Sequence, residues 1–456
     1  MVENLGRLSN LNTFIIMFKK IPLYSFLLFA AFLYALTNSC SGQLKKDFVT
    51  TIAPIEPSDL PSEYGSINRK SPCNDRLNYV PDPAFLDHTP EKEIRVNIHY
   101  MLSETEKNNF DESDGYQFGK QIIKECNKYL KKNLKMALPV GNNTPQLPLR
   151  YSYVLDKDPS TRNGLGIYFH RDDDLYYFDG TKSKGRNIGD RTVFKKYGVK
   201  KGKVLNIFMM EPHLDSLDSP TFVISGRGIA FGDWIKLTAV YQTTRDTTFT
   251  PTGGRRVYGR YAQQRTLNHE IGHCVGMGHS WRKNDGCDDT PPHGNCWGIT
   301  GKPPCDVKAI SNNMMDYIPV AQSVTPCQIG TAHRAMSDKK RKVRTCLQKT
   351  WCTLDREKTI EIKQDHEWNG AKDIEGHLVI MDGATLTLRC RLSLPRRAKI
   401  IVYPKGRLIL DGATLENDCG DQWEGIELWT YGEDKGEVVY FNSPTIKNAK
   451  NKISVL

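Results

Sequence analysis

The stretch NHEIGHCVGMGH, residues 268–279, decides how the central part of this chain folds. It contains the pattern H-E-x-x-H-x-x-G-x-x-H without a departure. His269 and His273 are four residues apart, so a helix projects both imidazoles from one face, where they can bind one metal ion. Gly276 suits the positive-φ residue at which such a helix ends. The turn brings in His279, and three neutral imidazoles leave the open position that is typical of a catalytic zinc.

Glu270 follows the first histidine, where its carboxylate can reach a water on the metal rather than the metal itself. That is the position of a general base. The alternatives are a structural histidine cluster and a zinc site that has lost its activity. Cys274 follows a ligand but points about 100° away from the ligand face of the helix. We therefore interpret Cys274 as a packing or disulfide residue.

A second motif, SNNMMDY, occupies residues 311–317. With the histidine pattern it resembles the metzincin metalloproteases, and its Asn-x-Met-Asp-Tyr form is similar to the pappalysin and cytophagalysin group. The resemblance covers roughly residues 73–345 and implies a Zn²⁺ cofactor and a protein or peptide substrate. It also implies Met315 beneath the zinc ligands and Tyr317 as a group that stabilises the tetrahedral intermediate. Met314 competes with Met315, but the Met-x-Tyr spacing favours Met315. A core methionine beside an ordinary loop tyrosine is the alternative.

The resemblance further implies a structural Ca²⁺ in the loop between the third histidine and the methionine motif. Oxygen ligands are supplied there by Asp285, Asp288, Asp289 and Thr290. A solvated charged loop has the same composition. The loop and the segment after it also carry cysteines, and two disulfides among them would hold Met315 and Tyr317 against the zinc. These cysteines are Cys287, Cys296, Cys305 and Cys327.

The flanking patterns predict a mixture of helices and strands. Residues 95–102 alternate between apolar and polar side chains, which predicts a half-buried strand. Further strands are expected at 149–155, 166–170, 204–210 and 235–241. Helices are expected at 116–134 and 258–273. Thr325, Pro326 and Gln328 form a capping box that starts a helix running to about residue 342. The result is an α/β (α+β) domain over residues 93–350, metzincin-like, with a mixed sheet and a zinc helix. Residues 226–241, where a substrate-binding edge strand should lie, carry no diagnostic pattern.

Residues 353–456 change to short β-branched runs separated by Gly, Asp and Pro. The pentapeptide DGATL at 382–386 recurs at 411–415. Short strands at a fixed period predict an all-β segment that begins a β-solenoid, or parallel β-helix. A small sandwich with two similar hairpins is the alternative. The chain stops at Leu456 with no evident cap, so this segment is either truncated or paired with something else.

The N-terminal segment predicts export. An apolar run at 21–36 follows Lys19 and Lys20 and is short for a bilayer span, as in a secretory signal over residues 1–39. Its exit resembles a loose bacterial lipobox in which Cys40 is lipidated. We therefore expect a lipoprotein of the bacterial cell envelope, attached to the membrane by its lipid, or a secreted protein. Residues 40–92 have no sustained period and are interpreted as a tether or pro-segment.

Export makes disulfides the default for most of the twelve cysteines. Without Cys40 the count is odd, so at least one cysteine is free or bound to something else. Cys73 lies about 20 residues before the first core strand, and its thiolate could occupy the open zinc position and keep the enzyme latent. An ordinary disulfide is the competing interpretation, and it is the favoured one.

Composition excludes several classes. The 456 residues are 39% hydrophobic and 25% charged, which excludes a largely disordered, collagenous or multi-spanning protein. The net charge of +11 is spread over 63 basic and 52 acidic residues and does not by itself imply nucleic acid. The basic run at 339–344 is interpreted as a solvated face. An inactive adhesion or glycan-binding protein and a carbohydrate lyase on the β segment remain the other functional classes. The sequence sets no oligomeric state.

Overall fold

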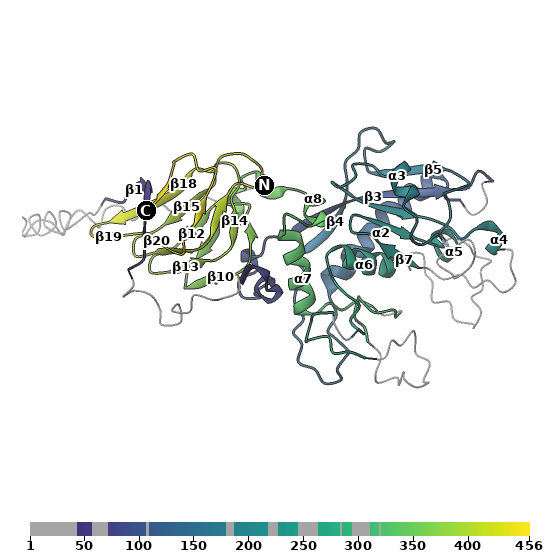
Figure 1. Cartoon of the computed structure of the whole chain (residues 1–456), viewed down its shortest axis with the longest axis horizontal. Helices are drawn as coiled ribbons and strands as arrows, with labels where there is room; N and C mark the ends of the chain where they lie inside the picture. Colours follow the sequence, from purple (N-terminus) through teal and green to yellow (C-terminus); the bar gives the residue numbers. More distant parts are fainter. Residues whose placement is uncertain are drawn as a thin grey trace, which may run out of the picture.

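The computed structural model describes residues 43–56, 72–105, 109–178, 187–217, 227–244, 263–282, 285–293, 311–318 and 321–456. The predicted signal at 1–39, Cys40, Cys296 and Cys305 lie outside these residues. Figure 1 shows an α/β part, mostly blue to teal, beside a strand-rich part in green to yellow. In the part of the chain that the structure describes, no helix has both the length and the apolar character needed to cross a membrane.

The α/β part is built on one mixed sheet, in the order β4-β3-β6-β8-β7, with β5 also paired to β3. All its pairings are parallel except that of β7 with β8, which is antiparallel at the sheet edge. A mixed sheet was expected, and the edge strand β7 lies in the segment that carried no sequence signal. The bounds are β3 Lys92–Leu102, β4 Tyr151–Leu155, β5 Ile167–Arg171, β6 Leu205–Met209, β7 Gly228–Ala230 and β8 Trp234–Leu237.

Helices cover both faces of this sheet. The long helix α2 buries Phe118, Ile122 and Cys126 in the main core, which also contains residues of α6 and α7. A second core, with Phe208 and Trp234, lies on the other face of the sheet, beside α3. The helix bounds are α2 Glu112–Lys132, α3 Thr192–Tyr197, α4 Leu214–Leu217, α5 Val240–Thr244, α6 Gln263–Cys274, α7 Pro326–Ser337 and α8 Lys342–Thr345.

Three sequence expectations in this part need correction. Strand β3 is buried over nearly its whole length instead of half-buried, because a core lies on each of its faces. The strand expected to reach residue 241 ends at Leu237, and the chain then forms α5. The capping box at Thr325 and Gln328 is confirmed, but α7 ends at Ser337, before the expected residue 342.

The C-terminal part is all-β, as predicted. Its strands are distributed over three sheets, and successive strands β9 to β17 visit the three sheets in turn. Every pairing among β9 to β18 is parallel, and Ile360, Leu378, Ile400 and Ile426 stack in one row of the core. The bounds are β9 Ile360–Ile362, β10 His366–Trp368, β11 Lys372–Asp373, β12 Leu378–Ile380, β13 Thr385–Leu388, β14 Arg391–Ser393, β15 Lys399–Val402, β16 Arg407–Asp411, β17 Thr414–Glu416, β18 Gly425–Tyr431, β19 Asp434–Lys435, β20 Glu437–Phe441, β21 Thr445–Ile446 and β22 Ser454–Val455.

The DGATL repeat does not mark equivalent strands. Leu386 of the first copy pairs with Leu408, whereas Leu415 of the second copy pairs with Leu392, in a different sheet. What the copies share is a tight turn before a strand, in which Gly383 and Gly412 have φ values of 73° and 64°. The fixed period inferred from this repeat was therefore wrong.

The segment expected to be a tether contains two strands that join the C-terminal part. β1 (Lys45–Phe48) pairs antiparallel with β18, and β2 (Thr51–Pro54) pairs parallel with both β20 and β22. Ile52 of β2 is fully buried in the C-terminal core. Strand edges at this end, for which the sequence offered no partner, are thus covered by the N-terminal segment.

The two parts of the chain are joined by buried charges. Asp373 of β11 is 1% exposed and binds Lys92 of β3 at 3.2 Å, Arg344 of α8 at 2.5 Å and Arg391 at 2.6 Å. Arg344 also binds Asp418 at 2.6 Å. Arg344 belongs to the basic run at 339–344 that was interpreted as a solvated face. Its other basic residues, Lys339 to Lys342, are exposed as expected, but Arg344 is only 4% exposed and departs from that interpretation. Figure 1 shows α8 on the side of the α/β part that faces the strands.

Candidate metal centre

The three predicted ligands converge. The Nε2 atoms of His269 and His273 are 3.1 Å apart, those of His273 and His279 are 3.1 Å apart, and those of His269 and His279 are 3.2 Å apart. His269 and His273 project from one face of α6, and His279 returns after the helix ends. Nitrogens this close can all bind a single ion at zinc–nitrogen distances of about 2.0 to 2.1 Å.

The hydrogen bonds of His269 and His273 leave one nitrogen of each ring available to a metal ion. Nδ1 of His269 lies 2.9 Å from the Met314 carbonyl, and Nδ1 of His273 lies 2.9 Å from the Met277 carbonyl. A carbonyl only accepts, so each Nδ1 must carry the proton and donate. In the neutral ring this leaves the Nε2 lone pair free for the ion. Three imidazole donors of this kind suit Zn²⁺.

Burial keeps the imidazoles neutral. It lowers the pKa of His269 to about 3 and that of His279 to about 4, and it also lowers the pKa of His273. Glu270 is 6% exposed, and burial raises the pKa of its carboxyl to about 8. A carboxyl held in this range can both take up and release a proton near neutral pH.

The end of α6 explains how His279 reaches its partners. Gly276 has φ of +91°, and its N–H donates to the His273 carbonyl at 3.0 Å. The next N–H, of Met277, donates to the Gly272 carbonyl at 2.9 Å. The chain reverses at Gly276, in a backbone conformation that residues with a Cβ atom rarely adopt.

Met315 packs directly against α6, the helix that carries His269 and His273. A Cβ added at Gly272 of α6 would collide with the Met315 sulfur and would lie 3.2 Å from its methyl carbon. Met315 is fully buried, and its N–H donates to the Asn313 side chain at 2.9 Å. Met314 is also buried, but its contribution to the site is the carbonyl that holds His269.

The methionine motif is anchored to the start of α7. Asn313 is fully buried and exchanges two hydrogen bonds, of 2.8 and 3.1 Å, with the Gln328 side chain. Gln328 is the capping-box residue, and it also accepts from the Thr325 N–H at 3.0 Å. One glutamine side chain therefore fixes both the helix start and the loop beneath the metal centre.

Tyr317 lies beside the ligands. Its ring centroid is 4.7 Å from that of His279 and 5.4 Å from that of His269. Burial and the neighbouring Glu270 raise the pKa of its phenol, so the hydroxyl keeps its proton at neutral pH. The indole ring of Trp281 also stacks on the His279 imidazole, with ring centroids 5.4 Å apart.

Asp316 links the third ligand to the methionine motif. Its carboxylate accepts from the Ser280 hydroxyl at 2.6 Å and lies 3.1 Å from Nε2 of His293. Ser280 directly follows His279, so this contact fixes the chain at the third ligand. These hydrogen bonds hold the pKa of Asp316 below its usual range despite its burial.

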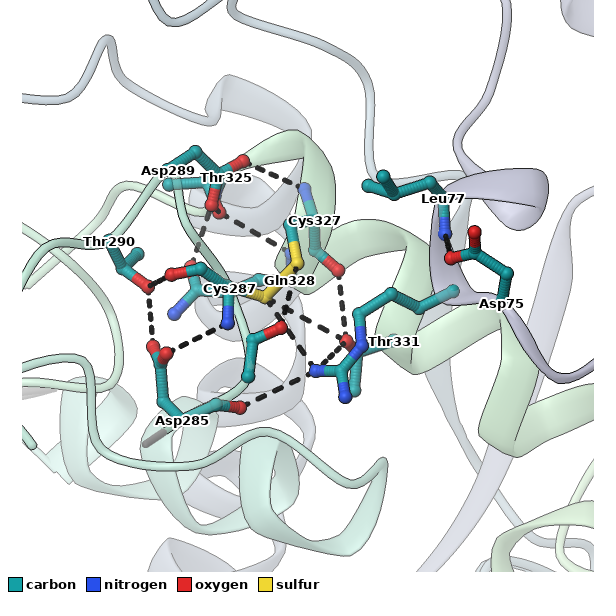
Figure 2. Close-up of a disulfide and its surroundings, with 12 residues drawn as sticks. Asp75, Leu77, Asp285, Cys287, Asp289, Thr290, Thr325, Cys327, Gln328 and Thr331 are labelled. Carbon is teal, nitrogen blue, oxygen red and sulfur yellow. Dashed lines mark hydrogen bonds between the residues drawn. A yellow bond between two sulfur atoms is a disulfide. The ribbon is translucent and has the colours of Figure 1, made fainter. Parts of the chain in front are cut away.

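The residues expected to bind calcium are engaged with protein donors (Figure 2). Asp285 accepts from the Cys287 N–H at 2.9 Å and from the Thr290 hydroxyl. Asp289 accepts from the Thr325 hydroxyl at 2.7 Å and from the Cys327 N–H at 2.9 Å. Asp288 is exposed. Among the described residues the three aspartates do not form a cluster of metal ligands, and calcium binding stays a prediction.

One of the two disulfides expected around this loop is present. Cys287 forms a disulfide with Cys327, with their Cα atoms 5.6 Å apart, and this disulfide joins the loop to α7 (Figure 2). Arg76 lies against it, donating to the Thr331 hydroxyl at 3.3 Å and to the Asp285 carbonyl at 3.4 Å. The other cysteines of the loop lie outside the described residues.

Cys73 is not brought to the metal centre. It forms a disulfide with Cys390 of the C-terminal part, so its sulfur is not available as a ligand and the latency interpretation is contradicted in this state. Cys352 pairs with Cys419. Among the described residues Cys126, Cys274 and Cys346 are free and buried, which fits the packing role inferred for Cys274.

Sequence reasoning missed several residues of the site. Asn313 and Asp316 stand inside the quoted methionine motif, so their positions were visible although their partners were not. Gly272 lies inside the histidine pattern at a position that the pattern leaves open. Gly228, where an added Cβ would collide with the side chain of Glu270, carried no sequence signal at all.

Comparisons with known proteins give limited similarity. No protein-family model matches the chain, and a search of curated proteins finds no match. Among solved structures, the chain is similar to mature mirolysin of Tannerella forsythia in complex with a cleaved peptide, with 18% identity, a TM-score of 0.36, and coverage of 56% of this chain and 95% of that one. Mirolysin in complex with a molecule named "compound 9" gives 18% identity, the same TM-score of 0.36 and coverage of 56% of this chain and 96% of that one. A mutant of Tannerella forsythia promirolysin gives 18% identity, a TM-score of 0.36 and coverage of 57% and 84%.

Proposed function

We propose that this chain is a zinc-dependent endopeptidase. The observation that carries the proposal is the convergence of three neutral imidazole nitrogens, 3.1 to 3.2 Å from one another, beside a buried carboxyl. His269, His273 and His279 would hold the ion. When bound, Zn²⁺ supplies a Lewis acid that activates water and polarises the scissile carbonyl.

The chain's own residues supply the proton transfers. Glu270 takes a proton from the attacking water as its oxygen bonds to the carbonyl carbon. Glu270 then delivers that proton to the amide nitrogen as the carbon–nitrogen bond breaks. The protonated Tyr317 phenol, which lies beside His279 and His269, donates to the oxygen that gains negative charge.

The finer assignments belong to the same proposal. The Asn-x-Met-Asp-Tyr motif supports a metzincin of the pappalysin and cytophagalysin group. The three parallel ladders of the C-terminal part support the start of a parallel β-helix. Export, with a lipid on Cys40 or simple cleavage after the signal, is supported by the sequence of the N-terminal segment alone.

A peptide hydrolysis assay on the full exported chain tests the function. We expect cleavage of casein-type peptides that is lost on chelation and restored by Zn²⁺. Glu270→Gln should retain zinc and lower the turnover rate by about 10² to 10⁴-fold, since a general base contributes on that order. His213→Ala is the control and should retain activity, because the ring contacts of this partly exposed histidine are with Tyr176 and Tyr177 and not with the three ligands.

The competing classes predict different outcomes. An inactive adhesion or glycan-binding protein would show no zinc-dependent cleavage in the wild-type chain. A carbohydrate lyase would act on polysaccharide and would not cleave the peptide, with or without the chelator. Full activity in the Glu270→Gln chain would contradict the role given to this carboxyl.

A further inference from the structure

The edge strand β7 lies close to the side chain of Glu270. A Cβ built on Gly228 would be 2.5 Å from Cγ, 2.6 Å from Oε1 and 2.8 Å from Cδ of that glutamate. Carbon atoms in contact prefer separations of about 3.5 to 4.0 Å. The glutamate therefore occupies space that exists only because residue 228 has no side chain.

The backbone of Gly228 is fixed by its neighbours in the sheet. Gly228 pairs with Leu237 of β8, and the Thr238 N–H donates to the Arg227 carbonyl at 2.9 Å. Its φ is not in the left-handed region, so the backbone conformation itself is open to alanine. The need for glycine at this position comes from the glutamate and not from the chain's own geometry.

All three atoms that meet the added Cβ belong to the Glu270 side chain. A flexible side chain can rotate away, so the fold tolerates the extra methyl group. The cost then falls on the position of the carboxyl, which must move by roughly 1 Å to restore ordinary contact. The ligand histidines are absent from the three nearest contacts of Gly228.

We propose that Gly228 is a positioning residue for the Glu270 carboxyl, holding open the space from which that group acts. The inference rests on the proposed function, in which Glu270 is the general base. Proton transfer requires donor and acceptor within about 2.6 to 3.2 Å. A displacement of about 1 Å can reduce the rate of an enzymatic reaction by about 10²-fold.

The variant Gly228→Ala in the full chain tests the proposal. We expect one zinc per chain, an unchanged melting temperature, a KM within about twofold of wild type and a kcat lower by about 10²-fold. The matched control is Gly189→Ala, because a Cβ at Gly189 meets nothing within 4 Å and its φ is not in the left-handed region. This control should match wild type.

A double-mutant cycle separates positioning from a general structural effect. In a Glu270→Ala chain, which has no carboxyl to displace, adding Gly228→Ala should change the residual rate by less than about twofold. An equal loss in both backgrounds would overturn the proposal, as would a Gly228→Ala kcat within about twofold of wild type.

Crystal structures give a readout that does not depend on activity. If the wild-type chain shows no zinc-dependent cleavage, the proposed function fails, but the positioning claim is still decided by comparing the wild-type and Gly228→Ala structures. A Glu270 carboxyl displaced by about 1 Å supports the claim. An unmoved carboxyl with a shifted β7 overturns it.

Discussion

At the scale of single residues, the site combines ionisable groups whose pKa values burial moves in opposite directions. Burial raises the pKa of Glu270 from 4.5 to about 8 and lowers that of His269 to about 3. Between pH 4.5 and 8 the folded, metal-free chain therefore holds a proton on Glu270 that the unfolded chain releases. This residue makes the metal-free protein less stable as the pH rises through that interval.

Glu270→Gln should remove this pH dependence, because a glutamine cannot lose a proton. In the presence of chelator, the free energy of unfolding of wild type should fall relative to that of the variant between pH 5 and 8. Denaturant unfolding at several pH values measures the difference in unfolding free energy between the two chains. Groups that titrate in the same way in both chains do not contribute to this difference. Parallel stability curves for the two chains would show that the carboxyl is not buried as described.

Some residues of the site could be predicted and others could not, for a physical reason. His269, Glu270, His273 and His279 are related by helical spacing and one turn, which a single sequence displays. The capping role of Gln328 was visible in adjacent residues, but its contact with Asn313 and that of Gly228 with Glu270 join segments distant in the chain, and local spacing contains no trace of such contacts.

At the scale of elements, the metal centre depends on how α6 packs on the methionine motif. Gly272 is the residue of α6 that meets Met315, and an added methyl group there would collide with the methionine sulfur. Met315 and its neighbour Met314, whose carbonyl holds His269, would have to shift together. Alanine has a higher intrinsic helix propensity than glycine, so the substitution alone should stabilise α6. Any loss of zinc affinity in the variant therefore comes from the contact with Met315.

We predict that Gly272→Ala lowers zinc affinity by about 10 to 100-fold. Losses of this size follow when a residue that orients the metal ligands, without binding the metal itself, is changed. Competition with a fluorescent chelator measures the affinity. Gly189→Ala again serves as the control, since it adds the same methyl group in open space. Unchanged affinity would mean that Met315 does not support the histidines.

Elements with local signals were predicted well. The capping box of α7 and the amphipathic face of α2 are confirmed because cap residues and helical periodicity are written in adjacent residues. Strands β1 and β2 were missed because four-residue strands owe their stability to partners in the C-terminal part. The DGATL repeat misled because it encodes a turn and not a coil.

At the scale of the whole molecule, the C-terminal part is locked to the α/β part by charge and by covalent bonds. Asp373 faces Lys92, Arg344 and Arg391 with almost no solvent contact, and desolvation is outweighed by these cations, which hold the pKa of Asp373 well below its usual range. Removing one partner from such a cluster leaves buried charge without compensation.

Asp373→Asn should therefore destabilise the chain by about 3 to 5 kcal/mol in denaturant unfolding. Glu361→Gln is the control in the same part of the chain, because the Glu361–Lys363 pair is 48% and 71% exposed and such pairs contribute about 0 to 1 kcal/mol. Equal effects of the two variants would show that the junction does not depend on the buried cluster.

The disulfide between Cys73 and Cys390 gives a second test at this scale. Cys73→Ser should leave zinc content and peptidase activity unchanged and reduce stability by about 2 to 4 kcal/mol. A rise in activity of the unprocessed chain would instead support latency through the Cys73 thiolate. Activity and unfolding measured on one preparation distinguish the two outcomes.

The central claim is that His269, His273 and His279 hold one zinc ion under Glu270. Anomalous diffraction at the zinc absorption edge, from crystals of the full chain grown with one equivalent of Zn²⁺, tests it most directly. We expect one strong peak within bonding distance of the three Nε2 atoms. A peak elsewhere, or none at these histidines, would contradict it.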